Sequence, residues 1–371
     1  MDRNDLDRWH MRHALDLAVR GEGRVEPNPM VGCVVARGAE VIGQGYHRRY
    51  GGDHAEVEAL RVAGSRAAGA EVYVTLEPCC HQGKTPPCTE ALLRARPARV
   101  VVAQPDPFPE VAGRGLSRLR EAGIEVVEGV LREQAEQICA PYLKLVRTGR
   151  PWVVAKWAMT LDGRIATRSG SSRWISGERS RQLVHHLRGR VDAIIVGRGT
   201  ARQDDPLLTA RPPGTRTATR IVLDRRATLP VDSQLVRTAS ETPVMVVVGP
   251  DAPSAERARL ETAGCEVFAV TDGEPGRLIE ALLDELGRRR MTNVLVEGGG
   301  QVLGTLLDKQ MIDEVHVFVA PKLIGGADAP GPIAGLGIER MNDALQIERP
   351  EVEIVDGDMY LTGRTTRRTN E

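Results

Sequence analysis

Short apolar segments of strand length alternate with segments of helical periodicity along the first 146 residues, and this alternation limits the possible folds more than any other feature. Helical spacing and strand patterns follow one another with few long interruptions. Elements that alternate in this way pack as layers around one sheet. We therefore predict an α/β domain here, with helices at 5–20, 54–64, 88–97, 115–123 and about 131–146, and strands at 30–36, 71–77, 98–104 and 124–129.

The segment "RTGRP" at 147–151 separates this run from a second one, because glycine and proline interrupt regular structure. A chain of 371 residues also exceeds the size at which one hydrophobic core usually stops growing. We predict two domains, at 1–148 and 149–371, and antiparallel strands at the end of the second. The second run has strand patterns at 152–159, 191–196, 219–224, 244–249, 265–270, 293–297 and 314–319, and two strands around an Asp-Gly turn within 351–363.

Charge and hydropathy argue against several classes of partner. Lysine plus arginine and aspartate plus glutamate number 50 each, so no net charge attracts nucleic acid or an anionic membrane surface. The longest apolar runs, such as 243–249, fall far short of the roughly 20 residues that a bilayer requires. The N-terminus lacks the apolar segment of a secretory signal. We expect a soluble, cytoplasmic protein whose six cysteines are reduced thiols, metal ligands or buried core residues.

Residues 76–88, "LEPCCHQGKTPPC", contain three of the six cysteines. Cys79 follows a strand pattern and Cys88 begins a helical one, so their thiols lie at the two ends of a proline-containing loop. A catalytic zinc ion takes three protein ligands and keeps a fourth position open. His54 opens the helical segment "HAEVEAL" and is the best third ligand; Glu56 then has the position of the proton-transferring glutamate of zinc nucleobase deaminases. The pattern predicts a zinc site of His54, Cys79 and Cys88 with Glu56 as the catalytic residue.

Each of these residues also has an ordinary explanation, since a histidine at a helix start is often a cap and a lone cysteine often fills a core. Their combination favours the metal site. Cys80 and His81 could compete for the ion, although consecutive cysteines do not easily point at one metal. Eight residues separate Cys79 from Cys88, where the P-C-x-x-C pattern has two. We expect this insert to line the pocket, with His81 contacting a heterocycle and Lys84 a phosphate; the alternative is that both are solvated.

The segment "EGGGQVLG" at 297–304 follows a strand pattern and opens a helical one. Backbone amides at such a helix start can bind a phosphate. The segment lacks the third glycine of G-x-G-x-x-G, and a glycine run alone often forms only a tight turn. Its position between a strand and a helix favours nucleotide binding.

Several motifs closely resemble those of the bifunctional riboflavin-biosynthesis deaminase/reductase family. The deaminase half of that family is similar across about 1–146 through "PNPMVGCVV", "GYH", "HAEVEAL" and "TLEPCCHQGKTPPC". The reductase half is similar across about 151–365 through "KWAMTLDGRIA", "SSRWIS", "VGRGTARQDDPLLT" and "VAPKLIGG". The resemblance implies a cytidine-deaminase-like three-layer α/β domain followed by a dihydrofolate-reductase-like α/β domain. Members usually have serine at the position of Cys80.

The same resemblance implies NADPH as the hydride donor and gives its contacts in the second domain. The implied cofactor contacts are Ala158, Trp174, Thr200, Asp204, Gly299, Gly300, Gln301, Val302, Leu303, Gly304 and Thr305. The implied substrate contacts are Ser172, Arg188, Leu208, Arg211 and Glu297. Both arginines could pair with a phosphate through charge-assisted hydrogen bonds. Asn28 and His47 are further candidates in the first domain. Lys156 is a candidate for a group that orients or protonates the acceptor. Arg225 stands where members have a small polar residue, and it could face the 2′-phosphate of the cofactor.

We therefore expect zinc-dependent hydrolytic deamination of a phosphorylated ribosylaminopyrimidine, followed by NADPH-dependent reduction of its ribosyl group to ribityl. We also expect a homo-oligomer that binds neither nucleic acid nor membrane. One alternative is a nucleoside or tRNA deaminase with an unrelated second domain, which the neutral net charge disfavours. Another is a structural zinc module joined to a nucleotide-sensing domain, in which Cys80 or His81 would complete the metal site.

Overall fold

The computed structural model describes residues 2–274 and 276–366. The chain divides into two compact units, Met1–Gly149 and Arg150–Glu371, each with its own sheet and cores. Among the described residues, no helix combines the length and the apolar character needed to cross a membrane.

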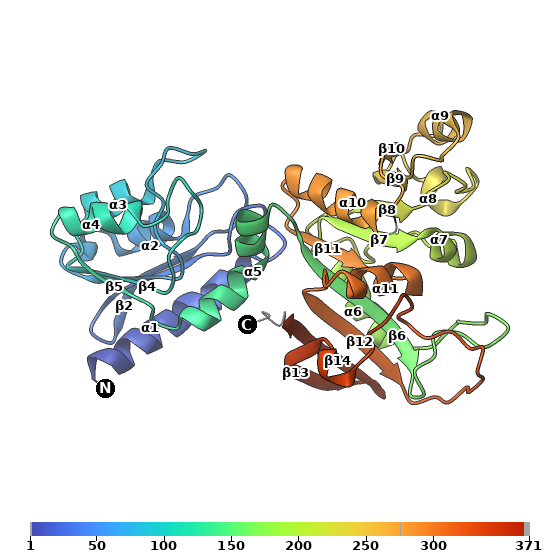
Figure 1. The fold of residues 1–371 in the computed structure, drawn as a ribbon. Coiled ribbons are helices and arrows are strands. Elements are labelled where there is room, and N and C mark those ends of the chain that lie inside the picture. Colours follow the sequence, from blue (N-terminus) through green and yellow to red (C-terminus); the bar gives the residue numbers. More distant parts are fainter. Residues whose placement is uncertain (1, 275, 367–371) are drawn as a thin grey trace. The chain divides into compact units, whose positions relative to one another are not determined.

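The first unit is a three-layer α/β structure, as predicted (Figure 1). Its described residues form a sheet of order β2-β1-β3-β4-β5, in which β1 is antiparallel to both neighbours and β3, β4 and β5 are parallel. Helices α1 and α5 pack on one face, and α2, α3 and α4 pack on the other. The elements are α1 Arg3–Ala18, β1 Gly32–Arg37, β2 Glu40–Tyr46, α2 Ala55–Ala63, β3 Glu71–Val74, α3 Cys88–Ala95, β4 Arg99–Val102, α4 Arg114–Glu121, β5 Glu125–Glu128 and α5 Arg132–Thr148.

Strand β2 was not predicted, because its glycines weaken the strand pattern. These glycines allow α2 to pack very closely on the sheet. A Cβ atom at Gly43 would lie 2.4 Å from the carbonyl oxygen of Ala59, and one at Gly45 would lie 2.5 Å from the Cβ atom of Glu58. The close packing fixes the position of α2, and therefore of the residues at its N-terminus.

The second unit contains a larger, mixed sheet. In the described residues its order is β10-β9-β8-β7-β11-β6-β12-β14-β13. The strands from β10 to β12 are parallel, and β14 and β13 are antiparallel, as predicted for the C-terminal strands. The strands are β6 Trp152–Thr160, β7 Ala193–Gly197, β8 Thr219–Leu223, β9 Val244–Val248, β10 Glu266–Ala269, β11 Asn293–Val296, β12 Glu314–Ala320, β13 Gln346–Val355 and β14 Asp358–Thr366.

Two hydrophobic cores cover the two faces of this sheet. One core includes residues of α10 and α11, and the other includes residues of α6, α7, α8 and α9. Because the central strands are parallel, the loops that follow β6, β7, β8 and β11 meet at one edge, where ligands of open α/β sheets usually bind. The helices are α6 Glu178–Arg188, α7 Arg198–Asp204, α8 Gln234–Arg237, α9 Ser254–Thr262, α10 Arg277–Arg288 and α11 Gly300–Asp308.

Candidate functional site

The three predicted zinc ligands meet in the first unit, although they come from three different elements. His54 is the N-cap of α2, Cys79 lies in the loop after β3, and Cys88 is the first residue of α3. His54 Nδ1 lies 3.2 Å from Cys88 Sγ and 3.5 Å from Cys79 Sγ. The three candidate ligand atoms all lie within 4.8 Å of one another. Two thiols and one imidazole at this spacing match the donor set of a catalytic zinc site.

Backbone hydrogen bonds hold the two ends of the cysteine loop together. The N–H of Cys88 donates to Cys79 Sγ at 3.3 Å, and the N–H of Thr89 donates to the carbonyl oxygen of Cys79 at 3.1 Å. These amides belong to the first turn of α3, where the helix dipole favours negative charge. The loop therefore closes in a position that stabilises the thiolate of Cys79.

The two thiols influence each other strongly. Hydrogen bonding with Cys88 lowers the pKa of Cys79 to about 4. The same contact, together with burial, raises the pKa of Cys88 well above its ordinary value. The pair thus accepts one negative charge readily and resists a second. A divalent cation would remove this resistance, because cysteine ligands bind metal as thiolates, and the donor set therefore fits zinc.

Glu56 lies in the first turn of α2, two residues after His54, and its side chain is buried. Burial raises the pKa of Glu56 to about 7. Its Oε2 atom is buried and has no hydrogen-bond partner. A buried polar atom without a partner is costly, and a carboxyl group that titrates near neutral pH suits proton transfer. These properties of Glu56 are compatible with a role in proton transfer.

Cys80 and His81 do not join the metal cluster found among the described residues. The thiol of Cys80 donates to the carbonyl oxygen of Glu110 at 3.5 Å. The ring of His81 lies against Phe108, with 5.7 Å between the ring centres. A structural zinc site would need a fourth protein ligand, so this arrangement favours a catalytic site.

His47 lies next to the predicted metal ligand His54, and Asn28 contacts His47. His47 donates from Nδ1 to the carbonyl oxygen of Asp53 at 3.0 Å, and its Nε2 accepts from the Asn28 amide at 3.2 Å. The His47 ring lies 5.2 Å from the ring of His54, measured between ring centres. Burial lowers the pKa of His47, which favours the neutral ring. Both residues therefore support the turn that precedes His54.

Lys84 lies in the cysteine loop between Cys79 and Cys88, with its ammonium group 4.0 Å from the centre of the Tyr50 ring.

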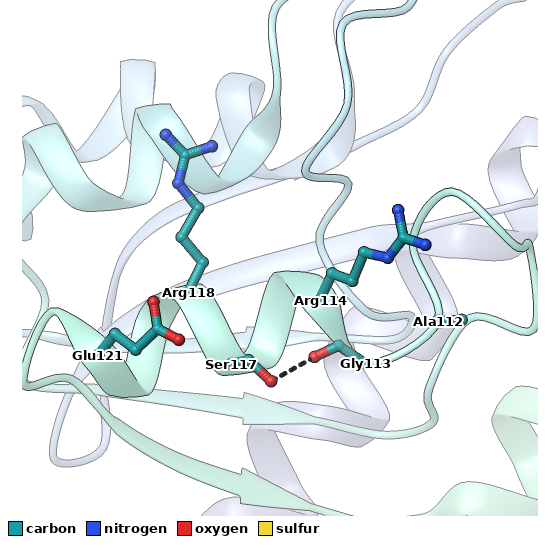
Figure 2. A pocket seen from close by; sticks show the side chains of 6 residues that line it. All are labelled: Ala112, Gly113, Arg114, Ser117, Arg118 and Glu121. Atoms are coloured by element: carbon teal, nitrogen blue, oxygen red, sulfur yellow. Dashed lines mark hydrogen bonds between the residues drawn. The ribbon is translucent and has the colours of Figure 1, made fainter.

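A shallow depression of about 550 Å³ lies at the start of α4. Arg114 and Arg118 extend from the same side of this helix (Figure 2). The start of α4 is held by the buried Glu77, whose carboxylate accepts hydrogen bonds from the N–H groups of Gly113 and Gly115 at 3.0 Å each. Glu77 was not predicted from the sequence, although an acidic residue directly before Pro-Cys was a usable signal. The lining residues Ala112, Gly113, Arg114, Ser117, Arg118 and Glu121 include none of the predicted metal ligands.

In the second unit, Lys156, Arg188 and Glu297 form a buried charged cluster. Arg188 donates to both carboxylate oxygens of Glu297, from Nε at 2.5 Å and from Nη2 at 2.9 Å. Lys156 Nζ lies 3.7 Å from the same carboxylate. Burial alone would raise the pKa of Glu297, but Arg188 and Lys156 outweigh it and hold the pKa at about 2. Burial lowers the pKa of Lys156 against the effect of Glu297. Lys156 lies on β6, Arg188 ends α6, and Glu297 directly follows β11.

The glycine segment follows β11 and leads into α11, as predicted. Gly298 has a φ angle of 113°, a value that favours glycine. A Cβ atom at Gly299 would lie 3.2 Å from Thr200 Oγ1, and one at Gly304 would lie 2.0 Å from the carbonyl oxygen of Ala334. The N-terminus of α11, Thr200 and the segment around Ala334 therefore meet closely. Free amides at such a helix start fit a phosphate group of a nucleotide.

The remaining predicted cofactor and substrate contacts of the second unit differ in their exposure and in the elements that position them. Trp174 is 63% exposed and lies under the guanidinium group of Arg181, which is 4.4 Å from the ring centre. Arg173 donates to the carbonyl oxygen of Asp204 at 2.6 Å. Val302 and Leu303 are buried in a core, so they could contact a cofactor only through their backbone. Ala158 lies on β6, Gly300, Gln301 and Thr305 lie on α11, and Ser172, Leu208 and Arg211 lie in loops.

Arg225 follows β8 at the same edge of the sheet. It donates to Asp251 at 2.8 Å, and its side chain is about half exposed. This exposed ion pair gives Arg225 a partner within the protein, and its contact with the 2′-phosphate of a cofactor stays a prediction. His185 was not predicted from the sequence. It lies one turn before Arg188 on α6 and donates from Nδ1 to the carbonyl oxygen of Thr209 at 3.0 Å. Its spacing of three residues from Arg188 was the available signal.

Comparison with known families gives a match for each unit. Residues 4–104 match the cytidine and deoxycytidylate deaminase zinc-binding region. Residues 151–361 match the RibD C-terminal domain. The riboflavin biosynthesis protein RibD of Actinobacillus pleuropneumoniae is 40% identical over 358 residues, which cover 96% of this chain and 94% of that protein.

Solved structures show the same similarity over nearly the whole chain. Acinetobacter baumannii RibD, form 1, is 38% identical with a TM-score of 0.87, covering 98% of this chain and 100% of that one. A diaminohydroxyphosphoribosylaminopyrimidine deaminase/5-amino-6-(5-phosphoribosylamino)uracil reductase from Thermotoga maritima is 34% identical with a TM-score of 0.85, again covering 98% and 100%. The similarity therefore extends through both units in the same order.

Proposed function

The chain belongs to the bifunctional RibD family of riboflavin biosynthesis proteins, and we propose that it catalyses two consecutive steps of that pathway. The first is deamination of a diaminohydroxyphosphoribosylaminopyrimidine by the unit Met1–Gly149. The second is reduction of 5-amino-6-(5-phosphoribosylamino)uracil by the unit Arg150–Glu371. These are the two activities named for the Thermotoga relative.

For the deaminase step, His54, Cys79 and Cys88 would hold the zinc ion. When bound, zinc supplies Lewis-acid activation of water near neutral pH. Glu56 would take the proton of that water and deliver it to the leaving ammonia, because its carboxyl group is buried, titrates near neutrality and has an oxygen without a partner. His81 and Lys84 would contact the pyrimidine and the phosphate.

For the reductase step, the amides at the start of α11 together with Thr200 would bind the phosphates of NADPH. When bound, NADPH supplies the hydride, and the protein supplies position and electrostatics. The Arg188–Glu297–Lys156 cluster would orient the ring-opened ribosyl group, and Lys156 could deliver the accompanying proton, since burial lowers its pKa. Arg211 would meet the substrate phosphate by a charge-assisted hydrogen bond.

The observation that carries the proposal is the buried Oε2 atom of Glu56, which has no hydrogen-bond partner, beside a three-ligand metal cluster. The test is the variant Glu56→Gln, which keeps the shape of the side chain and removes its acid–base chemistry. We expect zinc content to stay at the wild-type level while the rate of ammonia release falls by roughly 100-fold or more, the usual contribution of a general acid or base. Retained deamination in this variant would refute the assigned role.

Two further expectations belong to the same proposal. A homo-oligomer can be tested by sedimentation of the full chain. A cytoplasmic location can be tested by cell fractionation.

A further inference from the structure

His185 lies beside the proposed substrate site and has no role in the mechanism above. It precedes Arg188 by three residues, so both side chains lie on one side of α6. His185 Nδ1 donates to the carbonyl oxygen of Thr209 at 3.0 Å, and Arg188 Nη1 donates to the same oxygen at 3.4 Å. Both residues thus contact the short segment that connects Leu208 with Arg211.

Arg188 has little capacity left for a ligand. Its Nε and Nη2 atoms donate to Glu297, and Nη1 donates to Thr209. Three of the five N–H groups of a guanidinium therefore already have partners. Arg211, in contrast, is exposed. A phosphate group that pairs with Arg211 would bind more tightly if a residue of α6 donated a second hydrogen bond to it.

His185 becomes such a donor only when it is protonated. Its Nδ1 hydrogen is engaged by Thr209, so Nε2 carries a lone pair in the neutral ring and an N–H group after proton uptake. Burial and then Arg188 lower the pKa of His185, and Arg211 acts in the same direction. The hydrogen bond to Thr209 and the charge of Glu297 oppose this lowering. A phosphate dianion next to the ring would favour the charged form.

Building on the proposed reductase function, we propose that His185 is a substrate-binding residue that takes up one proton from solvent when a phosphorylated substrate binds, and then donates from Nε2 to the phosphate. Its charged neighbours are Arg188 on the same helix, Arg211 in the loop between α7 and β8, and Glu297 after β11. Binding of the phosphate is therefore linked to pH. The affinity for a phosphorylated ligand falls as the pH rises above neutrality, and a ligand without phosphate shows no such change.

The test uses the full chain and ribose 5-phosphate as the probe. Calorimetric titrations at about pH 7.5, where the phosphate is mostly a dianion because its second pKa is about 6, are run in two buffers of different ionisation enthalpy. Wild-type protein should take up protons on binding. His185→Asn keeps an N–H group for Thr209 but cannot be protonated, so it should show no uptake and roughly ten-fold weaker binding. His186→Asn, at the exposed neighbouring position, should behave as wild type.

Equal proton uptake in His185→Asn and wild type would overturn the inference. Binding of ribose 5-phosphate to wild type without proton uptake, or no binding at all, would also overturn it. Ribose without phosphate serves as the control ligand. NADPH oxidation with the deaminated substrate is measured on the same preparations. Wild-type protein that does not oxidise NADPH contradicts the proposed function, whereas the calorimetry alone decides the role of His185.

Discussion

Replacing Glu297 by glutamine removes one charge from the buried cluster and nearly preserves the volume of the side chain. In the folded protein Arg188 and Lys156 hold the pKa of Glu297 at about 2, compared with an ordinary value of 4.5. At 1.36 kcal/mol per pKa unit, this difference corresponds to about 3 kcal/mol of stability. Loss of one partner of a buried ion pair typically costs about 3–5 kcal/mol, which is a similar magnitude. We therefore expect Glu297→Gln to destabilise the protein by about 3 kcal/mol at neutral pH.

The sign of the pH dependence follows from the lowered pKa. The carboxylate contributes its full stabilisation above the unfolded-state pKa of about 4.5, and this contribution is lost as the pH falls through the folded-state pKa of about 2. The difference between wild type and Glu297→Gln should therefore be largest near neutrality and should narrow below about pH 4.5.

Urea unfolding followed by tryptophan fluorescence is a suitable assay, because three of the four tryptophans belong to the second unit. Asp284→Asn is the matched control. It breaks the exposed pair between Arg150 and Asp284, whose Nε–Oδ1 distance is 2.5 Å, and exposed pairs contribute at most about 1 kcal/mol. Equal stability of Glu297→Gln and wild type at neutral pH, or a gap that does not narrow in acid, would refute the reasoning.

Two other predictions concern the metal site and the cofactor site. Cys79→Ser should reduce the zinc content of the purified protein. Cys265→Ser, at a buried position outside the cluster, should leave the zinc content unchanged. Metal analysis in which Cys265→Ser loses zinc and Cys79→Ser retains it would disprove the ligand assignment. Gly304→Ala should destabilise the chain by about 1–3 kcal/mol and weaken NADPH binding, because its Cβ atom would meet the carbonyl group of Ala334. Gly199→Ala, with nothing within 4 Å of its Cβ, should show neither effect in thermal unfolding and NADPH titration, and identical behaviour of the two variants would count against the packing argument.

Much of the fold could be predicted from the sequence, because helical and strand periodicity are local properties. Strand β2 could not be predicted, because its glycines weaken the strand pattern and are needed only for the close packing of α2 on the sheet. A Cβ atom at Gly43 would meet the backbone of Ala59, and that contact is not visible in a pattern of neighbouring residues.

The zinc ligands could be proposed from the sequence because His54, Cys79 and Cys88 each stand at the start of a helix or after a strand. The interactions among the predicted substrate contacts of the second unit were harder to predict. Arg188 and Glu297 were both expected to contact substrate, and the structure shows that they also bind each other across 109 positions of the chain. Sequence spacing contains no information about such a long-range pair, and the same is true of the contact between His185 and Thr209.

We propose that one chain contains a zinc-dependent deaminase and a separate NADPH-dependent reductase. The decisive experiment measures both activities on the full chain before and after removal of zinc by a chelator. We expect ammonia release from the diaminopyrimidine substrate to be lost and to return when zinc is added back, while NADPH oxidation with the deaminated substrate continues at the wild-type rate. Ammonia release that survives complete zinc removal, or loss of both activities together, would refute this division of the two activities.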